Sequence, residues 1–360
     1  MKILVIMKRF GANKDMVIEN FGRQIRLFEH LAKKHKIDFF CPDYTKKESK
    51  IISRNETRYI IKKVSLLSLL PFYNTLKNLI KNEKYDVIVA TTDPLIGILG
   101  YSMSKNFRVP LIYDLQDIYA AYGAYKIPFV SYLDKKAVKN ADVVLTVSES
   151  LRRYISKFRK KNTYVIQNGI DLGLFKEIDK KTARKKLNLP LKGKIIIYTG
   201  EISKDKGVDS LIEAFKEVKK IIPNIFLLLS GKVKGNINVN QNAVIYEKYS
   251  KREEVITALN AADIAIIPNT RSIFSKYCFP YKLFEYMAVG LPIVATNIGD
   301  VALFLKNFEG SLCKPNDVED LKSKIIIQLK KDKVDYKKIV KNHSWLKLSK
   351  KIGNILEMLK

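Results

Sequence analysis

Cysteine, histidine and long hydrophobic runs are scarce in this chain of 360 residues. Three cysteines without a CxxC spacing argue against a disulfide scaffold or a zinc ribbon, and they fit a reducing compartment. The first residues, MKILVIMKRFG, contain an apolar run of only about five residues, which is too short for a signal peptide. We therefore expect this stretch to be the first strand of a sheet and the protein to be cytoplasmic.

Acidic residues are also few, because 36 Asp and Glu against 66 Lys and Arg give a net charge of +30. The excess is present in both halves and comes mostly from lysine, which is typical of solvated surfaces. No zinc-finger, RRM or basic-zipper pattern is present, so we expect no nucleic-acid partner. A lysine-rich surface is the simplest interpretation, and attraction to an anionic membrane surface is the alternative.

Short apolar runs alternate with amphipathic segments along the whole chain. This alternation is typical of βα units, so we expect an α/β fold with parallel sheets and helices on both faces. Six runs in each half predict two Rossmann-like domains, and the length is sufficient for two. The predicted strands are residues 2–7, 37–40, 86–91, 110–115, 143–148 and 163–168, then 194–200, 225–231, 243–247, 264–269, 292–296 and 310–315.

The segment YTGEISKDKGVDSLIEAF contains the first candidate site. In open α/β sheets ligands bind beyond the carboxyl ends of the strands. Gly200 ends a predicted strand there, and Lys206 precedes a helix that begins near Val208. A helix N-terminus binds phosphate, and a neighbouring lysine adds a positive charge. The segment is neither a P-loop nor GxGxxG, so a solvated loop lysine remains the alternative.

The segment FPYKLFEYMAVGLPIVAT, residues 279–296, contains another candidate site. It predicts a helix over residues 281–289 and then a buried strand. Lys282 in the first turn is placed to meet a phosphate, and Glu285 to accept hydrogen bonds from vicinal hydroxyls such as those of a ribose. The alternative is an ordinary exposed Lys–Glu pair with a spacing of three residues.

The order and spacing of these segments resemble the retaining glycosyltransferases of family four, which have the two-domain GT-B fold. The segment with Lys206 resembles the family's donor-phosphate loop, and the segment with Lys282 and Glu285 resembles its nucleotide-binding helix. Connecting segments such as ADVVLTVSESLRRYI, VIQNGIDLGLF, ADIAIIPN and HSWLKLSKKI also resemble the family, so the resemblance covers nearly the whole chain.

The resemblance implies a domain organisation. We expect an acceptor-binding Rossmann-like domain at residues 1–165 and a nucleotide-sugar-binding one at residues 166–335, facing each other across a cleft. Residues 336–360 would form a helix that packs back on the first domain. The implied co-substrate is a UDP- or GDP-sugar, with no metal and no other cofactor.

By the family pattern, Lys206 would contact the donor diphosphate and Glu285 the ribose hydroxyls. The full set of expected donor-binding residues is Gly200, Lys206, Phe279, Pro280, Tyr281, Lys282, Leu283 and Glu285. Two departures from the pattern affect the donor. Glu201 stands where the family commonly has an arginine, and Tyr277 stands where the family's paired glutamates require an acid. The donor site therefore lacks one cation and one carboxylate, and the identity of the sugar stays open.

The acceptor side is expected in the first half of the chain. Gly11 and Gly22 are candidates for close backbone approach, and Asp93 follows a predicted strand. Asp114 and Asp117 are candidate catalytic residues that polarise an acceptor hydroxyl, and capping of loops by Asx turns is the alternative.

Histidine is absent from this candidate acceptor site. Gln116 takes the place of a histidine found in some members of the family, and His30, His35 and His343 lie elsewhere in the chain. A histidine base from this segment is therefore excluded.

The function that these patterns predict is retaining transfer of a sugar from a nucleotide-sugar to a glycan or lipid-linked acceptor, in the synthesis of a surface polysaccharide, a glycolipid or a glycoprotein glycan. In this mechanism Lys206 and helix N-termini stabilise the leaving diphosphate. Two alternatives remain: a sugar-nucleotide epimerase or phosphorylase of similar fold, and a non-catalytic basic protein that binds nucleic acid or membrane.

The apolar segment at residues 64–82 is too short to cross a bilayer and is broken by Pro71. It is either a core helix or a surface helix of a protein that is peripheral on the inner face of the membrane. In the case of a surface helix, four residues would enter the bilayer: Leu69, Leu70, Phe72 and Tyr73.

Overall fold

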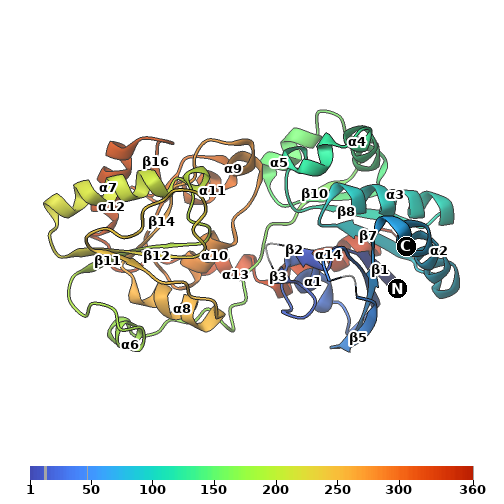
Figure 1. Cartoon of the computed structure of the whole chain (residues 1–360), viewed down its shortest axis with the longest axis horizontal. Helices are drawn as coiled ribbons and strands as arrows, with labels where there is room; N and C mark the ends of the chain where they lie inside the picture. Colours follow the sequence, from blue (N-terminus) through green and yellow to red (C-terminus); the bar gives the residue numbers. More distant parts are fainter. Residues whose placement is uncertain (12–13, 47, 360) are drawn as a thin grey trace. The chain divides into compact units, whose positions relative to one another are not determined.

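The computed structural model describes residues 1–11, 14–46 and 48–359 (Figure 1). The chain divides into two compact units. Unit 1 comprises Met1–Asn168 and the residues from Trp345 onwards, and unit 2 comprises Gly169–Ser344. Each unit is built around one sheet that is covered by helices.

The sheet of unit 1 has eight strands in the order β10-β9-β8-β7-β1-β4-β6-β5. Neighbours pair in parallel except for β5, which is antiparallel to β6 at one edge. The central strands are continuous apolar runs because both of their faces are covered, as in β7, all of whose residues are buried. The strands are β1 (Lys2–Ile6), β4 (Lys36–Asp43), β5 (Lys50–Arg54), β6 (Thr57–Lys63), β7 (Val87–Thr91), β8 (Leu111–Leu115), β9 (Val143–Thr146) and β10 (Thr163–Val165), with a small hairpin of β2 (Phe10–Gly11) and β3 (Lys14–Asp15).

The hairpin of β5 and β6 is absent from the strands predicted from the sequence. Its two turn residues, Asn55 and Glu56, have φ angles of 47° and 63°, the backbone of a tight hairpin turn. One face of β5 is exposed and its residues are half polar, so this edge strand has no apolar run that marks it in the sequence.

In the sequence, most helices of unit 1 lie between the strands that they connect. Helix α3 illustrates the local signals: Asp93 accepts hydrogen bonds from two N–H groups of the first turn, Pro94 is the first helical residue, and Arg108 ends the helix in the left-handed conformation. The C-terminal helix α14 lies beside α1 (Figure 1), and the Ser349 hydroxyl donates to the Leu27 carbonyl at 2.6 Å. The helices are α1 (Arg23–Glu29), α2 (Leu69–Glu83), α3 (Pro94–Phe107), α4 (Val130–Asn140), α5 (Glu149–Ile155) and α14 (Trp345–Glu357).

The sheet of unit 2 has six parallel strands in the order β13-β12-β11-β14-β15-β16. The strands are β11 (Lys194–Thr199), β12 (Ile225–Ser230), β13 (Val244–Tyr246), β14 (Ile264–Ile267), β15 (Ile293–Thr296) and β16 (Leu312–Cys313). The helices are α6 (Lys180–Lys186), α7 (Val208–Ile221), α8 (Arg252–Ala261), α9 (Ile273–Tyr277), α10 (Tyr281–Ala288), α11 (Gly299–Leu305), α12 (Val318–Gln328) and α13 (Lys337–Asn342). Because all six strands are parallel, the segments that follow them meet at one carboxyl edge.

The segment at residues 64–82 forms a short 3-10 turn at Leu66–Ser68 and then helix α2. One face of α2 is buried, and its Phe72 packs against Phe40 with 5.3 Å between the ring centroids. Of the two alternatives for this segment, the one in which Phe72 enters a bilayer is therefore wrong, because this ring is part of the core of unit 1. Among the residues that the structure describes, no helix is long and apolar enough to cross a membrane.

Candidate functional site

The carboxyl edge of the unit 2 sheet brings Gly200 and Lys282 together. Gly200 follows β11 with a φ of +121°, and a Cβ built on it would lie 2.9 Å from the Lys282 Nζ. The Lys282 amine also lies over the Tyr198 ring, 4.0 Å from its centroid. Glycine at position 200 thus leaves the space in which a lysine from a helix 82 residues further along the chain reaches the end of β11.

Lys206 lies in the loop that joins β11 to α7. The loop ends in a 3-10 turn, Lys204–Lys206, and Gly207 turns the chain into α7 with a φ of +70°. A Cβ on Gly207 would lie 1.9 Å from the Pro268 carbonyl oxygen, so the loop is held closely against the chain that follows β14. The Lys206 amine lies 4.8 Å from the centroid of the Phe274 ring.

The two amines affect each other electrostatically. The pKa of Lys282 falls from its ordinary value to about 7, first because the amine is buried and then because the charge of Lys206 is close. Glu285 opposes this shift but does not cancel it. Neither amine forms an ion pair with a carboxylate of the described residues. Near neutral pH the edge of the sheet therefore has a charged Lys206 and a partly protonated Lys282, neither of them paired with a carboxylate of the described residues.

Glu285 lies one turn further along α10, with 20% of its side chain exposed. Burial raises the pKa of its carboxyl group, and the charges of Arg252 and Lys282 act in the opposite direction. The Arg252 guanidinium is 4.0 Å from the carboxylate and lies over the Phe175 ring. Sequence reasoning missed Arg252, because a charged residue at the start of α8 is indistinguishable in sequence from an exposed helix end.

Helix α10 is fixed to the sheet by its other face. Leu283 and Phe284 are completely buried, and Phe279 is 3% exposed. Phe279 and Phe284 pack together with a centroid separation of 5.0 Å. The Tyr286 hydroxyl accepts a hydrogen bond from the Thr199 N–H at 3.0 Å, which joins the helix to the end of β11. Sequence reasoning also missed this tyrosine, whose hydroxyl is buried inside the apolar face of the helix.

The remaining predicted donor residues begin the same helix. Pro280 occupies the cap position of α10 in an extended conformation, and Tyr281 is the half-buried first residue. Unit 2 therefore gathers all eight predicted donor-binding residues around the ends of β11 and α10.

In unit 1 the predicted catalytic residue Asp114 is fully buried at the end of β8. Its carboxylate accepts hydrogen bonds from Arg23 at 2.9 Å and from the Thr91 hydroxyl at 3.1 Å. Gln116 donates to Thr91 at 2.6 Å and to Gln24 at 2.9 Å, so this network joins the ends of β7 and β8 to α1. Sequence reasoning missed Arg23, which lies 91 residues away from Asp114.

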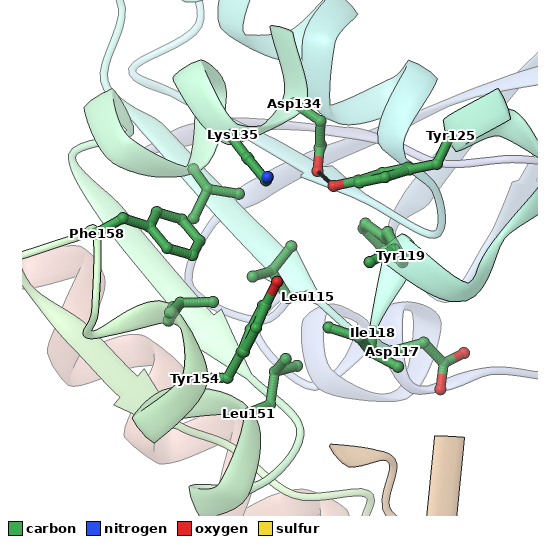
Figure 2. Close-up of a pocket in the computed structure, with 13 residues that line it drawn as sticks. Leu115, Asp117, Ile118, Tyr119, Tyr125, Asp134, Lys135, Leu151, Tyr154 and Phe158 are labelled. Atoms are coloured by element: carbon green, nitrogen blue, oxygen red, sulfur yellow. Dashed lines mark hydrogen bonds between the residues drawn. The ribbon is translucent and has the colours of Figure 1, made fainter. Parts of the chain in front are cut away.

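Asp117 lies three residues further along and is half-buried. It accepts a hydrogen bond from the Tyr122 hydroxyl at 2.6 Å. It also lines a cavity of about 30 Å³, the space of a single water molecule. Figure 2 shows its carboxylate pointing out of this cavity, whose opposite side holds the hydrogen-bonded pair of Tyr125 and Asp134. The cavity is too small for a sugar. The Asp117 carboxylate points away from the cavity, so the cavity is not the place where Asp117 would meet an acceptor.

The other acceptor-side candidates are spread over unit 1. Asp93 caps α3 and forms an ion pair with Lys8 at 2.9 Å. Gly22 precedes α1 with a φ of +110° and lies against the Gln24 amide of the Asp114 network. Gly11 is in the small hairpin beside Met16, and residues 12–13 of its loop lie outside the described residues.

Comparisons with known families agree with this arrangement. Residues 179–344 match the family model described as "Glycosyl transferases group 1", and residues 25–174 match the one described as "Glycosyltransferase Family 4". The chain belongs to the family-four glycosyltransferases. The match at residues 179–344 lies within unit 2. The match at residues 25–174 lies in unit 1, except for its last residues, which belong to unit 2.

The curated relatives share less than 30% of their aligned residues with this chain. The chain is 27% identical over 227 residues to Bacillus subtilis TuaC, a glycosyltransferase named for teichuronic acid biosynthesis, covering 61% of this chain and 55% of TuaC. It is 24% identical over 274 residues to the Staphylococcus aureus capsular polysaccharide biosynthesis glycosyltransferase CapM, covering 70% and 71%. The chain spans about half the length of most of the curated relatives it matches.

Solved structures show the same fold. Sucrose-phosphate synthase from Thermosynechococcus elongatus has a TM-score of 0.75 and 19% identity, covering 99% of this chain and 98% of that chain. HepE of Anabaena, solved in complex with UDP, has a TM-score of 0.76 and 18% identity, covering 99% and 100%. The predicted fold class, GT-B with two Rossmann-like domains, is confirmed.

Proposed function

We propose that the protein transfers a sugar, with retention of anomeric configuration, from a UDP- or GDP-sugar to a glycan or lipid-linked acceptor. The observation that carries this proposal is the pair of amines at the end of β11, Lys206 and Lys282. Two nearby cations repel each other, and an anion between them relieves the repulsion. The N-terminus of α7, which follows Lys206, adds N–H groups directed at the same edge.

The ligand that fits is a nucleoside diphosphate. Its two phosphates carry the charge that the amines require, and its ribose hydroxyls need a nearby acceptor. Glu285, one turn along α10 from Lys282 and held by Arg252, supplies that acceptor. A single inorganic anion would leave the half-buried Glu285 carboxylate without a partner on the ligand side.

The proposed reaction uses the diphosphate as the leaving group. The bond from the anomeric carbon to the phosphate oxygen breaks, and the acceptor oxygen bonds to the same face of that carbon. The acceptor's proton passes to an oxygen of the leaving diphosphate. One negative charge develops on the diphosphate as the bond breaks, and Lys206 and Lys282 stabilise it. Electrostatic stabilisation of this kind is worth about 10²- to 10³-fold in rate for each group removed.

On the acceptor side we propose different roles for the two aspartates. Asp117 is the candidate for polarising an acceptor hydroxyl, because its carboxylate is only half-buried and accepts a hydrogen bond from the Tyr122 hydroxyl. Asp114 is saturated by Arg23 and Thr91, so its proposed role is to hold the loop that carries Asp117. Gly11, Gly22 and Asp93 remain candidates for contacts with the acceptor through the surrounding loops.

A lipid-linked acceptor at a membrane is supported by the start of α2. The side chains of Leu67, Leu69 and Leu70 are 97%, 49% and 76% exposed. No Asp or Glu occurs from residue 57 to residue 82, whereas Lys62, Lys63, Lys77 and Lys81 do. Exposed leucines beside lysines fit the interface of an anionic bilayer. An anionic membrane is therefore the proposed partner, and its inner face is the proposed location.

The test of the proposed function is a thermal-shift panel of UDP, GDP, dTDP and ADP and their common sugars, with Glu285→Ala as the matched control. A ligand at about 100 times its Kd stabilises a protein by about 2.7 kcal/mol, which is several degrees for a unit of this size. We expect one base to shift the wild type and not Glu285→Ala. A panel in which no nucleotide raises the melting temperature would refute the proposed donor site.

A further inference from the structure

An open pocket of about 650 Å³ lies in unit 2, among residues that follow β14 and β15. It is formed by α9, the chain before it and the turn that leads from β15 to α11. Its polar side chains are Arg271, Ser272, Lys276, Tyr277 and Asn297. Two of these are cations, and none of the residues that line the pocket is an acid.

The position of this pocket relates it to the donor site. The strands β11, β14 and β15 are neighbours in the sheet, and the pocket lies over the carboxyl ends of β14 and β15. Neighbouring strands are about 4.8 Å apart, so the ends of β14 and β15 lie roughly 5 and 10 Å along the edge from the end of β11. Phe274 of α9 lies under the Lys206 amine, and the Thr270 hydroxyl donates to the Asp205 carbonyl at 2.8 Å. This separation is that of a sugar ring from the diphosphate to which it is attached.

The hydrogen-bonding character of the pocket is unusual for a neutral sugar. Sugar hydroxyls are commonly held by carboxylates, which accept their protons, but here the resemblance to the family places Tyr277 at the position of such an acid. Tyr277 and Asn297 can donate or accept, and the Ser272 hydroxyl is bonded to Ser275 at the start of α9. Arg271 and Lys276 are donors only. A ligand that suits them brings the acceptor oxygens itself.

Arg271 is the residue best suited to such a ligand. Arg9, Arg23 and Arg184 form buried ion pairs, whereas Arg271 has neither a hydrogen bond nor an ion pair within the described parts of the chain. A guanidinium matches a carboxylate with two parallel hydrogen bonds, which an amine cannot do. Two cations beyond those that face the diphosphate therefore fit one further anionic group on the ligand.

We propose that the donor sugar carries a carboxylate, as a uronic acid does, and that Arg271 and Lys276 bind this group. This inference rests on the proposed function, because it assumes that a nucleotide diphosphate occupies the neighbouring amines. It adds the chemical class of the sugar, which the sequence leaves open. The alternative is that these two cations also serve the diphosphate.

The experiment measures Kd by calorimetry for UDP, UDP-glucose and UDP-glucuronate, or for GDP, GDP-mannose and GDP-mannuronate if the protein binds the guanine base. The two sugars of each pair differ only at C6. We expect the wild type to bind the uronate about tenfold more tightly than the neutral sugar. Arg271→Gln should reduce this preference to about twofold or less without changing the Kd of UDP. Arg108→Gln, which removes the same charge from an exposed site in unit 1, should retain the preference.

Three outcomes overturn the inference. Equal affinity of the wild type for both sugars would show that the pocket does not recognise a carboxylate. An equal loss of affinity for UDP and for both sugars in Arg271→Gln would assign Arg271 to the diphosphate. Absence of binding by any of the nucleotides would remove the proposed function and this inference with it, whereas binding of UDP without a preference would remove only the inference.

Discussion

If Lys282 binds the donor diphosphate as proposed, its charge should make the affinity for the donor depend on pH. Its pKa of about 7 reflects burial of the amine and the nearby charge of Lys206. The bound diphosphate favours the charged form, so above pH 7 the protein must take up a proton in order to bind. With this pKa about three quarters of Lys282 is charged at pH 6.5 and about 3% at pH 8.5. We therefore expect the affinity to fall about 20-fold between these two values.

The assay is calorimetry with the nucleotide-sugar that stabilises the protein in the thermal-shift panel. A nucleotide-sugar is preferable to UDP, because its diphosphate diester keeps two negative charges over this pH range. At pH 8 the binding enthalpy should also vary with the ionisation enthalpy of the buffer, since close to one proton is taken up for each ligand bound.

Two variants separate Lys282 from other groups that titrate. Lys282→Met should bind more weakly at pH 6.5 and show little change up to pH 8.5. Lys206→Met removes the neighbouring charge, so the pKa of Lys282 should rise and the loss of affinity should move to higher pH. A wild-type affinity that is constant from pH 6.5 to 8.5, or that falls equally in Lys282→Met, refutes the reasoning.

Three further predictions concern other residues. Lys206→Met should lower kcat by about 10²- to 10³-fold with little change in melting temperature, because among the described residues the amine has no ion pair and lies over the Phe274 ring. A rate near wild type would exclude its role. Asp114→Asn should lower the free energy of unfolding in urea by about 3 to 5 kcal/mol, since it removes the buried carboxylate that pairs with the buried Arg23. Asp117→Asn should keep its stability and lose kcat. Leu67→Ser with Leu70→Ser should weaken binding to vesicles of phosphatidylglycerol and phosphatidylcholine by about tenfold or more, and Leu191→Ser, an exposed leucine of unit 2, should not.

Much of the fold could be predicted because parallel strands that are buried on both faces consist of continuous apolar runs, which can be recognised in the sequence. Residues 194–199 and 225–230 are examples, and both are central strands of unit 2. The hairpin of β5 and β6 could not be predicted in this way. Its strand β5 is at the edge of the sheet, where only one face meets the protein, and the exposed face carries Ile51 and Ser53, so no apolar run marks it.

The residues of the candidate site could also be predicted only in part. Lys206, Lys282 and Glu285 could be proposed from sequence, because Lys206 precedes α7 and the other two lie in the first two turns of α10. The contacts and charges that surround these side chains could not be predicted from sequence. The proximity of Lys282 to Gly200, the ion pair of Arg252 with Glu285 and the saturation of Asp114 by Arg23 all join residues that are 33 or more positions apart. Such contacts depend on how helices and strands pack in three dimensions, so they leave no local pattern in the sequence.

The departure at Glu201 from the family pattern can be related to the position of Lys282. Glu201, where an arginine is common in the family, directs its carboxylate to the Ser203 hydroxyl at 3.1 Å and lies 3.9 Å from the amine of Lys234. The Lys282 amine instead approaches Gly200, the residue before it. We infer that the cation at the end of β11 comes from α10 in this chain. An arginine reintroduced by Glu201→Arg should then raise donor affinity little in the wild type, and should restore part of it in Lys282→Met. A gain of equal size in both backgrounds would mean that the two positions serve different parts of the ligand.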